Sequence, residues 1–268
     1  LFLKKLIYIF LKIMMSNKLL QIKNIKKQYK QKDQKPIAAL KGVSLDIYND
    51  EVITLLGVNG AGKSTLSSII ATLHPATEGD IIFDNKSIYE DLINYRSHLG
   101  FCPQKPNLDG LLTLEQNLRF AGRLHRMPKN EITTRLNKLV EQFELGDYLD
   151  RKADVLSGGY RQRFMIARCL MHSPQIVLLD EPTVGLDPHI RRQIWAKIKE
   201  LKQEGVSVIL TTHYLDEAEI LSDRVCILDK GLIKLIDTPE KLLSDFKKKN
   251  LEDVFLALMQ EPQENQKD

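Results

Sequence analysis

Short apolar runs alternate along this chain with stretches whose apolar residues recur at helical spacing. The runs Val52–Leu56, Ile176–Leu179 and Val206–Leu210 are apolar and contain β-branched residues, so they predict buried strands. Apolar residues recur every three or four positions from Ser64 onward and over Pro188–Glu204, which predicts a helix after a strand in each case. This alternation favours an α/β fold with a mostly parallel sheet covered by helices on both faces.

The middle of the chain is helical without intervening strands. Leu111–Leu124 and Glu131–Leu145 both place apolar residues three and four positions apart, with Thr113 and Asn130 as the expected N-caps. We therefore predict a small helical subdomain, inserted into the α/β domain at about residues 105–165.

The segments toward either end follow other patterns. Leu19–Asp50 is extended and partly alternating, which predicts an antiparallel β subdomain before the first buried strand. Leu251–Met259 has the pattern of a short amphipathic helix, whereas Glu261–Asp268 is polar and is expected to fray. We predict a main domain at 17–240, followed at 241–268 by this helix and the polar tail.

Residues 1–14 leave two interpretations open. The segment Leu1–Met15 is apolar, but lysines interrupt it and it is too short to span a bilayer. A translation start at Met14 or Met15 would make the first fourteen residues non-native, and the alternative is a basic amphipathic anchor on a membrane surface. No later apolar run reaches the length of a membrane span, so any transport pathway is expected on another chain.

Composition excludes several classes of protein. The 268 residues are 43% hydrophobic, which is enough to bury a core and excludes a disordered chain. The net charge of +4 comes from 39 basic and 35 acidic residues, a balance that does not suggest a dedicated nucleic-acid binder. Cys102, Cys169 and Cys226 are odd in number and widely spaced, so they indicate neither a disulfide framework nor a metal cluster. A reducing cytoplasm is the default compartment.

The segment Gly57–Thr65, with the sequence GVNGAGKST, joins the first buried strand to the helix that follows. Its glycines allow positive φ and a close backbone approach, so that successive N–H groups and the helix N-terminus converge on an anion. Lys63 would reach the β- and γ-phosphates of a nucleoside triphosphate, and the Ser64 hydroxyl would coordinate Mg²⁺. We call this segment the phosphate loop and predict that it binds ATP and Mg²⁺ through Gly57, Asn59, Gly60, Ala61, Gly62, Lys63, Ser64 and Thr65.

Two later segments narrow the class of ATP-binding protein. Leu156–Arg163, with the sequence LSGGYRQR, opens a helix, and we call it the signature segment. Ile176–Pro182, with the sequence IVLLDEP, is an apolar strand that delivers Asp180 and Glu181 to the edge of the sheet beside the phosphate loop. Considered alone, the first could be a glycine-rich helix cap and the second a pair of acids at a helix start.

In order and separation, these three segments resemble the ABC-type ATPases, and the resemblance runs from about Tyr29 to Pro239. It implies a P-loop NTPase-type α/β fold with antiparallel and helical subdomains. It also implies that Glu181 is the general base, that Asp180 holds the magnesium shell, and that Ser157, Gly158 and Gly159 cap ATP held by a second subunit. Tyr160 stands where the family commonly has glutamine. The resemblance implies four further roles. Gln104 would touch the metal or the water, and His213 would be the switch histidine that contacts the γ-phosphate. Tyr29 would stack on adenine, and Asp187 would communicate between the two ATP sites.

Three stretches resemble ABC-2-type exporters: EPTVGLDP at 181–188, TTHYLDEAE at 211–219 and LEDVFLALM at 251–259. The resemblance implies an ATP-binding and hydrolysing subunit at the cytoplasmic face of the cell membrane, working with polytopic permease subunits. It also implies a homodimer or a paralogous heterodimer that closes on ATP and reopens after hydrolysis, with no nucleic-acid partner. The alternatives are a soluble ABC ATPase acting on DNA or ribosomes, and an importer subunit.

Overall fold

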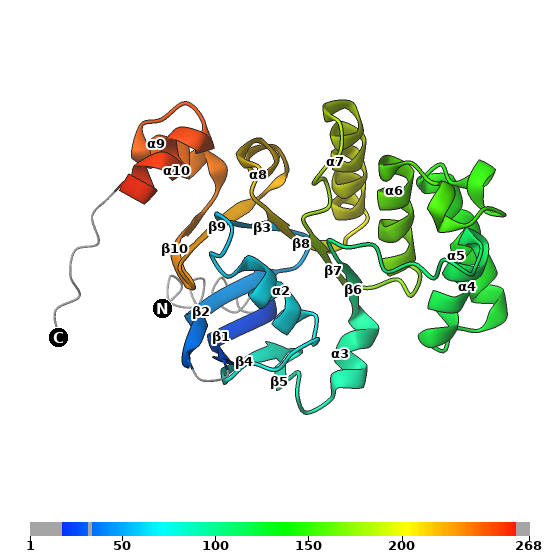
Figure 1. Cartoon of the computed structure of the whole chain (residues 1–268), viewed down its shortest axis with the longest axis horizontal. Coiled ribbons are helices and arrows are strands. Elements are labelled where there is room, and N and C mark those ends of the chain that lie inside the picture. The colour runs from blue at the N-terminus through cyan, green and yellow to red at the C-terminus, as the bar shows by residue number, and fades with distance from the viewer. Residues whose placement is uncertain (1–17, 32–33, 261–268) are drawn as a thin grey trace, which may run out of the picture.

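A six-stranded sheet forms the centre of the computed structural model, which describes residues 18–31 and 34–260 (Figure 1). Its strands lie in the order β10-β9-β3-β8-β7-β6, and all neighbours are parallel except β10 and β9. The predicted mostly parallel sheet is therefore confirmed. The strands are β3 (Val52–Leu56), β6 (Leu99–Cys102), β7 (Ile176–Asp180), β8 (Ser207–Thr212), β9 (Arg224–Asp229) and β10 (Leu232–Asp237).

Both faces of this sheet are buried. Along β8, Val208 and Leu210 belong to a core shared with the helices on one face, whereas Ile209 belongs to a second core on the other. Because side chains alternate along a strand, a strand with a core on each side is apolar at nearly every position. This explains the continuous apolar runs of the sequence.

A second sheet, entirely antiparallel, covers one side of the first. Its order is β2-β1-β4-β5, and its residues Leu20 and Ile22 share a core with Ile53 of β3 and Leu66 of α2. The predicted antiparallel subdomain is thus present. Its elements and their neighbouring helices are β1 (Lys18–Gln31), β2 (Gln34–Tyr48), β4 (Glu78–Phe83), β5 (Lys86–Ser87), α2 (Lys63–Ile70) and α3 (Leu92–His98).

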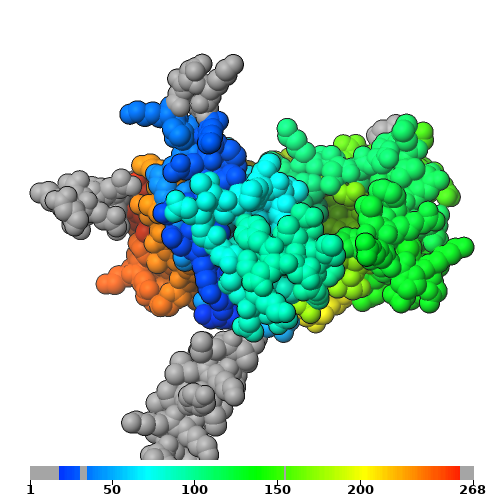
Figure 2. Space-filling view, turned by 90° about the horizontal axis from the view of Figure 1, so that it is seen from below, coloured from blue at the N-terminus to red at the C-terminus, as the bar shows by residue number. Residues whose placement is uncertain are grey.

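The helical subdomain (green) forms one end of the molecule, and the blue strands of the antiparallel sheet lie between it and the C-terminal elements (orange) at the other end, as Figure 2 shows. The Thr113 side chain accepts a hydrogen bond from the Gln116 backbone, which confirms it as an N-cap. The expectation for Asn130 is wrong, because the chain leaves Pro128 extended and turns helical at Lys129, so Asn130 lies inside the helix. The elements are α4 (Leu114–Leu124), α5 (Lys129–Gln142), η1 (Gly146–Tyr148), η2 (Ala153–Val155) and α6 (Gly158–Cys169).

Two histidine rings stack where this subdomain meets the central sheet. The His125 and His172 rings are nearly parallel, with centroids 3.6 Å apart, and His172 Nε2 lies 3.0 Å from the carbonyl oxygen of Leu99. Burial is the largest of the effects that lower the pKa of His172 to about 4; the neighbouring His125, Arg135 and His98 act in the same direction, and the hydrogen bond to Leu99 opposes them. Burial also lowers the pKa of His125, so both rings favour the neutral form at pH 7.

The helices that follow β7 in the chain pack on the central sheet, and the last of them form the C-terminal end of the described chain. Helix α10 packs on α8 and α9, with Leu251 and Val254 buried, and the Leu251 N–H donates to Glu219 Oε2 of α8 at 2.8 Å. No described helix is both long and apolar enough to cross a membrane. The expectations for residues 1–14 and Glu261–Asp268 concern residues outside the described part. These helices are α7 (Pro188–Gln203), α8 (Leu215–Leu221), α9 (Pro239–Phe246) and α10 (Leu251–Gln260), so the helices predicted at Pro188–Glu204 and Leu251–Met259 are both present.

Candidate functional site

The phosphate loop fits its surroundings only with glycine at particular positions. A Cβ on Gly57 would lie 2.5 Å from the backbone oxygen of Leu228. Gly62 has φ of +110°, and its Cβ would lie 3.0 Å from the Ala39 oxygen, while Gly60 has φ of +84° in open space. The loop thus packs against β9 and β2 while its backbone turns into the left-handed region that favours glycine.

Lys63, the first residue of α2, lies over this loop and is only 4% exposed. Its Nζ donates to the Gly57 carbonyl oxygen at 2.8 Å and lies 3.7 Å from Glu181 Oε1. Burial lowers the pKa of Lys63, and the nearby carboxylates of Glu181 and Asp180 oppose that shift. The ammonium is therefore largely desolvated and held between the phosphate loop and the Glu181 carboxylate.

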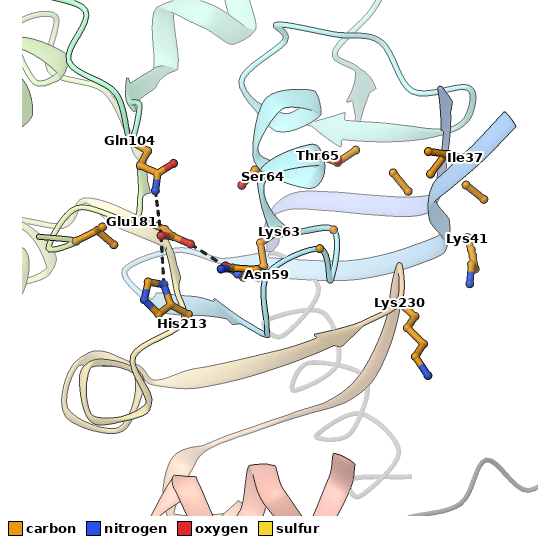
Figure 3. A pocket seen from close by; sticks show the side chains of 15 residues that line it. Ile37, Lys41, Asn59, Lys63, Ser64, Thr65, Gln104, Glu181, His213 and Lys230 are labelled. Atoms are coloured by element: carbon orange, nitrogen blue, oxygen red, sulfur yellow. Dashed lines mark hydrogen bonds and ion pairs between the residues drawn. The ribbon is translucent and has the colours of Figure 1, made fainter. Parts of the chain in front are cut away.

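Three side chains from separate elements converge on the Glu181 carboxylate (Figure 3). Gln104 Nε2 donates to Glu181 Oε2 at 3.1 Å, and His213 Nδ1 lies 3.2 Å from the same oxygen. Lys63 approaches the other oxygen. The structure thus brings together four residues that the sequence places up to 150 positions apart.

The backbone of Glu181 has an unusual conformation for a non-glycine residue. Its φ is +48°, and its N–H donates to the backbone and side-chain oxygens of Thr211 at 3.1 and 3.0 Å. Left-handed conformations of non-glycine residues are held at some cost and gather at functional sites. With this backbone conformation, the Glu181 carboxylate lies at the cavity among Gln104, His213 and Lys63.

Asp180, the last residue of β7, lies beside Glu181 but outside the lining of the cavity. Its Oδ1 accepts a hydrogen bond from Thr211 Oγ1 at 2.5 Å. Burial raises the pKa of Asp180, the Thr211 hydrogen bond opposes the rise, and the Glu181 charge adds to it. Bound Mg²⁺ would favour the ionised form of this carboxylate.

The oxygen donors at this edge suit a magnesium ion. Mg²⁺ prefers one or two carboxylates, other oxygen ligands and retained water. The Ser64 hydroxyl, the Asp180 carboxylate and the Gln104 side-chain oxygen are donors of this kind, and the Gln104 oxygen is available because the amide nitrogen donates to Glu181. No cluster of three or more His, Cys, Asp or Glu suited to a metal occurs among the described residues.

A cavity of about 630 Å³ opens over the phosphate loop. It takes most of its lining from predicted residues, namely Asn59, Gly60, Gly62, Lys63, Ser64, Thr65, Gln104, Glu181 and His213. It also takes residues that sequence reasoning missed. These are Ile37, Ala38, Ala39 and Lys41 of β2, Val184, and Lys230 in the turn between β9 and β10.

Long-range backbone hydrogen bonds bring the missed residues to the cavity. The Lys41 N–H donates to the Gly231 oxygen, and the Gly231 N–H donates to the Ala61 oxygen, both at 2.9 Å. Neither the sequence of β2 nor that of the β9–β10 turn indicates that these backbone groups bond to each other. A basic residue beside the turn glycine, Lys230, is the one local feature that could have drawn attention.

Several predicted residues lie outside the cavity lining. Tyr29 is 40% exposed and pairs with Ile37 across β1 and β2, one strand beyond the wall. Ser157 caps α6, where its side chain accepts from the Tyr160 N–H, and Asp187 stands at the N-cap position of α7 without a side-chain cap. Gly57, Ala61, Gly158 and Gly159 are also outside the lining.

Comparison with known proteins identifies this arrangement. The family model described as ABC transporter matches residues 40–184. The linearmycin resistance ATP-binding protein LnrL of Bacillus subtilis (strain 168) is 37% identical over 84% of this chain and 71% of its own length. The spermidine/putrescine import ATP-binding protein PotA of Clostridium novyi (strain NT) is 36% identical over 86% of this chain and 65% of its own.

Human ATP-binding cassette sub-family A member 2 is 38% identical over 78% of this chain, which spans only 8% of that protein. Among solved structures, the ATP-binding subunit of an ABC transporter superposes with a TM-score of 0.80 at 29% identity, covering 90% of this chain and 100% of that one. A dimeric ATP-binding cassette in a post-hydrolysis state, bound to ADP and Pi, gives 0.75 at 32% identity, covering 82% and 98%.

Proposed function

Because this chain belongs to the ABC transporter family and has the fold of its ATPase cassettes, we propose that it is the ATP-hydrolysing subunit of an exporter whose membrane path lies on other chains. The observation behind the proposal is the convergence of Lys63, Gln104 and His213 on the Glu181 carboxylate at the phosphate-loop cavity. The cargo is unknown.

The residues of the cavity divide the work of hydrolysis. Backbone N–H groups of the phosphate loop and the Lys63 ammonium bind the β- and γ-phosphates. Ser64, Asp180 and Gln104 would hold Mg²⁺, which neutralises developing charge on the phosphate oxygens. Glu181 accepts the proton of the attacking water, and its contacts with Gln104 and His213 orient the carboxylate for that task.

The site of one chain is incomplete on its own. Ser157, Gly158 and Gly159 offer a hydroxyl and backbone N–H groups at the N-terminus of α6, yet they do not line the cavity. We propose that they cap the ATP held by a second cassette, identical or paralogous, in agreement with the dimeric solved relative. ATP then closes the dimer and hydrolysis reopens it.

Export is favoured over import by two of the exporter-like stretches. Residues 211–219 and 251–259 pack on each other in the fold, and the hydrogen bond from Leu251 to Glu219 joins them directly. Of the two relatives, LnrL is named for linearmycin resistance and PotA for spermidine/putrescine import, and the exporter-like stretches lead us to propose export. We propose that the subunit works at the cytoplasmic face of the cell membrane with polytopic permease subunits.

Hydrolysis is tested on the purified chain with Mg²⁺ and ATP. Phosphate release is expected from the wild type, and Glu181→Gln should lower it by about a hundredfold or more while ATP still binds. A wild-type chain that does not bind ATP, or a Glu181→Gln variant with normal hydrolysis, would contradict the catalytic assignment.

Direction and partner are tested in cells. Export predicts that the chain fractionates with washed membranes together with a polytopic protein, and that deleting its gene increases sensitivity to toxic compounds. Wild-type protein should restore resistance and Glu181→Gln should not. Recovery in ribosomal or nucleoid fractions without a membrane partner would favour the soluble alternative, and dependence on a substrate-binding protein would favour import.

A further inference from the structure

A set of stacked side chains lies behind the switch histidine, outside the cavity. The His213 ring faces the Tyr214 ring, with centroids 4.4 Å apart. The Arg191 guanidinium lies over the Tyr214 ring, 4.2 Å from its centroid, and over the Trp195 ring at 5.1 Å. Arg191 and Trp195 belong to α7, which lies next to α8 (Figure 1), so one guanidinium joins α7 to the residue following the switch histidine.

The guanidinium is fixed in this position from α8. Arg191 Nη2 donates to both carboxylate oxygens of Asp216, at 2.9 and 3.1 Å, and the Arg191 side chain is only 15% exposed. A planar guanidinium can stack on an aromatic face while it donates in its own plane, which the compact ammonium of lysine cannot do. The position therefore uses the shape of arginine as well as its charge.

The same set reaches the residues that follow the catalytic carboxylate. Trp195 Nε1 donates to Glu217 Oε1 at 2.7 Å, and Thr183 Oγ1 donates to the same oxygen at 2.8 Å. Glu217 is completely buried. Thr183 comes two residues after Glu181 and lies in the turn at 182–185 that leads to Asp187. The set thus touches the chain on both sides of the site, at His213 and just after Glu181.

We propose that Arg191 is a positioning residue for hydrolysis, a role that rests on the proposed ATPase function. By holding Tyr214, Arg191 keeps the His213 imidazole against Glu181. Through Trp195 and Glu217 it ties that orientation to the turn after Glu181. A shift of α7 or of the Asp187 turn is then transmitted to the His213 ring.

The test compares steady-state ATP hydrolysis by the full chain and its variants. Arg191→Lys keeps the charge next to Asp216 and loses the planar stack, and it is expected to lower kcat about tenfold while KM for ATP stays within about twofold. KM is spared because Lys63 and the phosphate loop are untouched. The matched control is Arg192→Lys, an exposed neighbour on α7, for which wild-type kcat is expected.

Variants at Tyr214 give an independent readout. Tyr214→Phe retains the ring and should keep wild-type kcat, whereas Tyr214→Leu should fall to the level of Arg191→Lys. The double variant Arg191→Lys/Tyr214→Leu should be no slower than either single variant, because both substitutions remove the same contact between the guanidinium and the ring. Because Arg191 also touches Trp195, the fold of each variant is checked by its melting temperature rather than by tryptophan emission.

Several results would overturn the inference. These are wild-type kcat in Arg191→Lys, a loss that appears wholly in KM, or a double variant whose loss is the product of the two single losses. If Arg191→Lys does not fold, equal activities of Tyr214→Phe and Tyr214→Leu would overturn it instead. Absence of hydrolysis in the wild type would contradict the proposed function, a result distinct from all of these.

Discussion

The Lys63 ammonium and the Glu181 carboxylate lie 3.7 Å apart, and both side chains are less than a tenth exposed. Lys63 also donates to the Gly57 carbonyl oxygen, so its ammonium is held at the phosphate loop. In the proposed function, the pair links the residue that binds the triphosphate to the residue that accepts the proton of the attacking water. Each member therefore has a separable effect on binding and on hydrolysis.

Lys63→Ala is expected to weaken ATP binding by about ten- to a hundredfold, the range for losing a hydrogen bond to a charged group. Binding of a fluorescent ATP analogue measures the effect. Lys199→Ala, an exposed lysine on α7, is the control and should bind normally. Equal affinities in the two variants would show that Lys63 does not contact the phosphates.

Gly57→Ala is expected to lower the free energy of unfolding by about 1–3 kcal/mol, the usual cost of overpacking, because its Cβ would meet the Leu228 backbone oxygen at 2.5 Å. ATP binding should weaken with it, since the loop must shift. Gly146→Ala is the control, because a Cβ there meets nothing within 4 Å. Chemical denaturation of both variants gives the comparison, and equal midpoints would contradict the packing seen at Gly57.

His172 should make the stability of the fold depend on pH. Its folded pKa of about 4 lies below the unfolded value of about 6.5, so the unfolded state binds more protons between these values. Stability is full above pH 6.5 and falls as the pH falls toward 4. We expect a loss of about 1–3 kcal/mol over that interval, after allowance for partial exposure.

The His172→Gln variant tests whether His172 causes this pH dependence of stability. Glutamine can still donate to the Leu99 oxygen but does not titrate, so denaturation midpoints measured from pH 7 to pH 4.5 should fall less steeply than in the wild type. His74→Gln, at an exposed histidine, should leave the wild-type slope unchanged. An unaltered slope in His172→Gln would assign the acid sensitivity to other groups.

Glu219→Ala is expected to lower stability by about 1 kcal/mol, the typical cost of losing a helix cap, because Glu219 accepts from the first N–H of α10. Melting temperature and proteolysis of the C-terminal helix would both report it. The exposed carboxylate Asp245 of α9 provides the control, Asp245→Ala, whose melting should match the wild type. Increased cleavage within α10 in both variants would argue against a specific cap.

The sequence could predict those features that depend on interactions between residues close together in the chain. The buried strand Val52–Leu56, the helix beginning at the phosphate loop and the Thr113 cap depend on neighbours within a few residues, so their spacing is visible in one stretch of chain. The N-cap predicted at Asn130 is wrong because two local signals, Pro128 and Asn130, compete there. Pro128 already sets an extended conformation, and the helix therefore starts before Asn130.

The far wall of the cavity depended on contacts between distant segments. Lys41 and Lys230 reach it because backbone groups of Gly231 bond to both β2 and the phosphate loop. Nothing in either segment alone encodes that pairing. The stacking of Arg191 on Tyr214, beside His213, escaped for the same reason, since α7 and α8 meet only in the folded chain.

The opposed burial of Val208, Ile209 and Leu210 sets mechanical limits on the molecule. A strand clamped between two close-packed layers resists both bending and sliding, since displacement toward either side would open voids on the other. The carboxyl ends of β3, β7 and β8 therefore behave as a stiff platform. We therefore expect movement driven by ATP to be largest at the periphery, where α6 joins the helical subdomain to that platform.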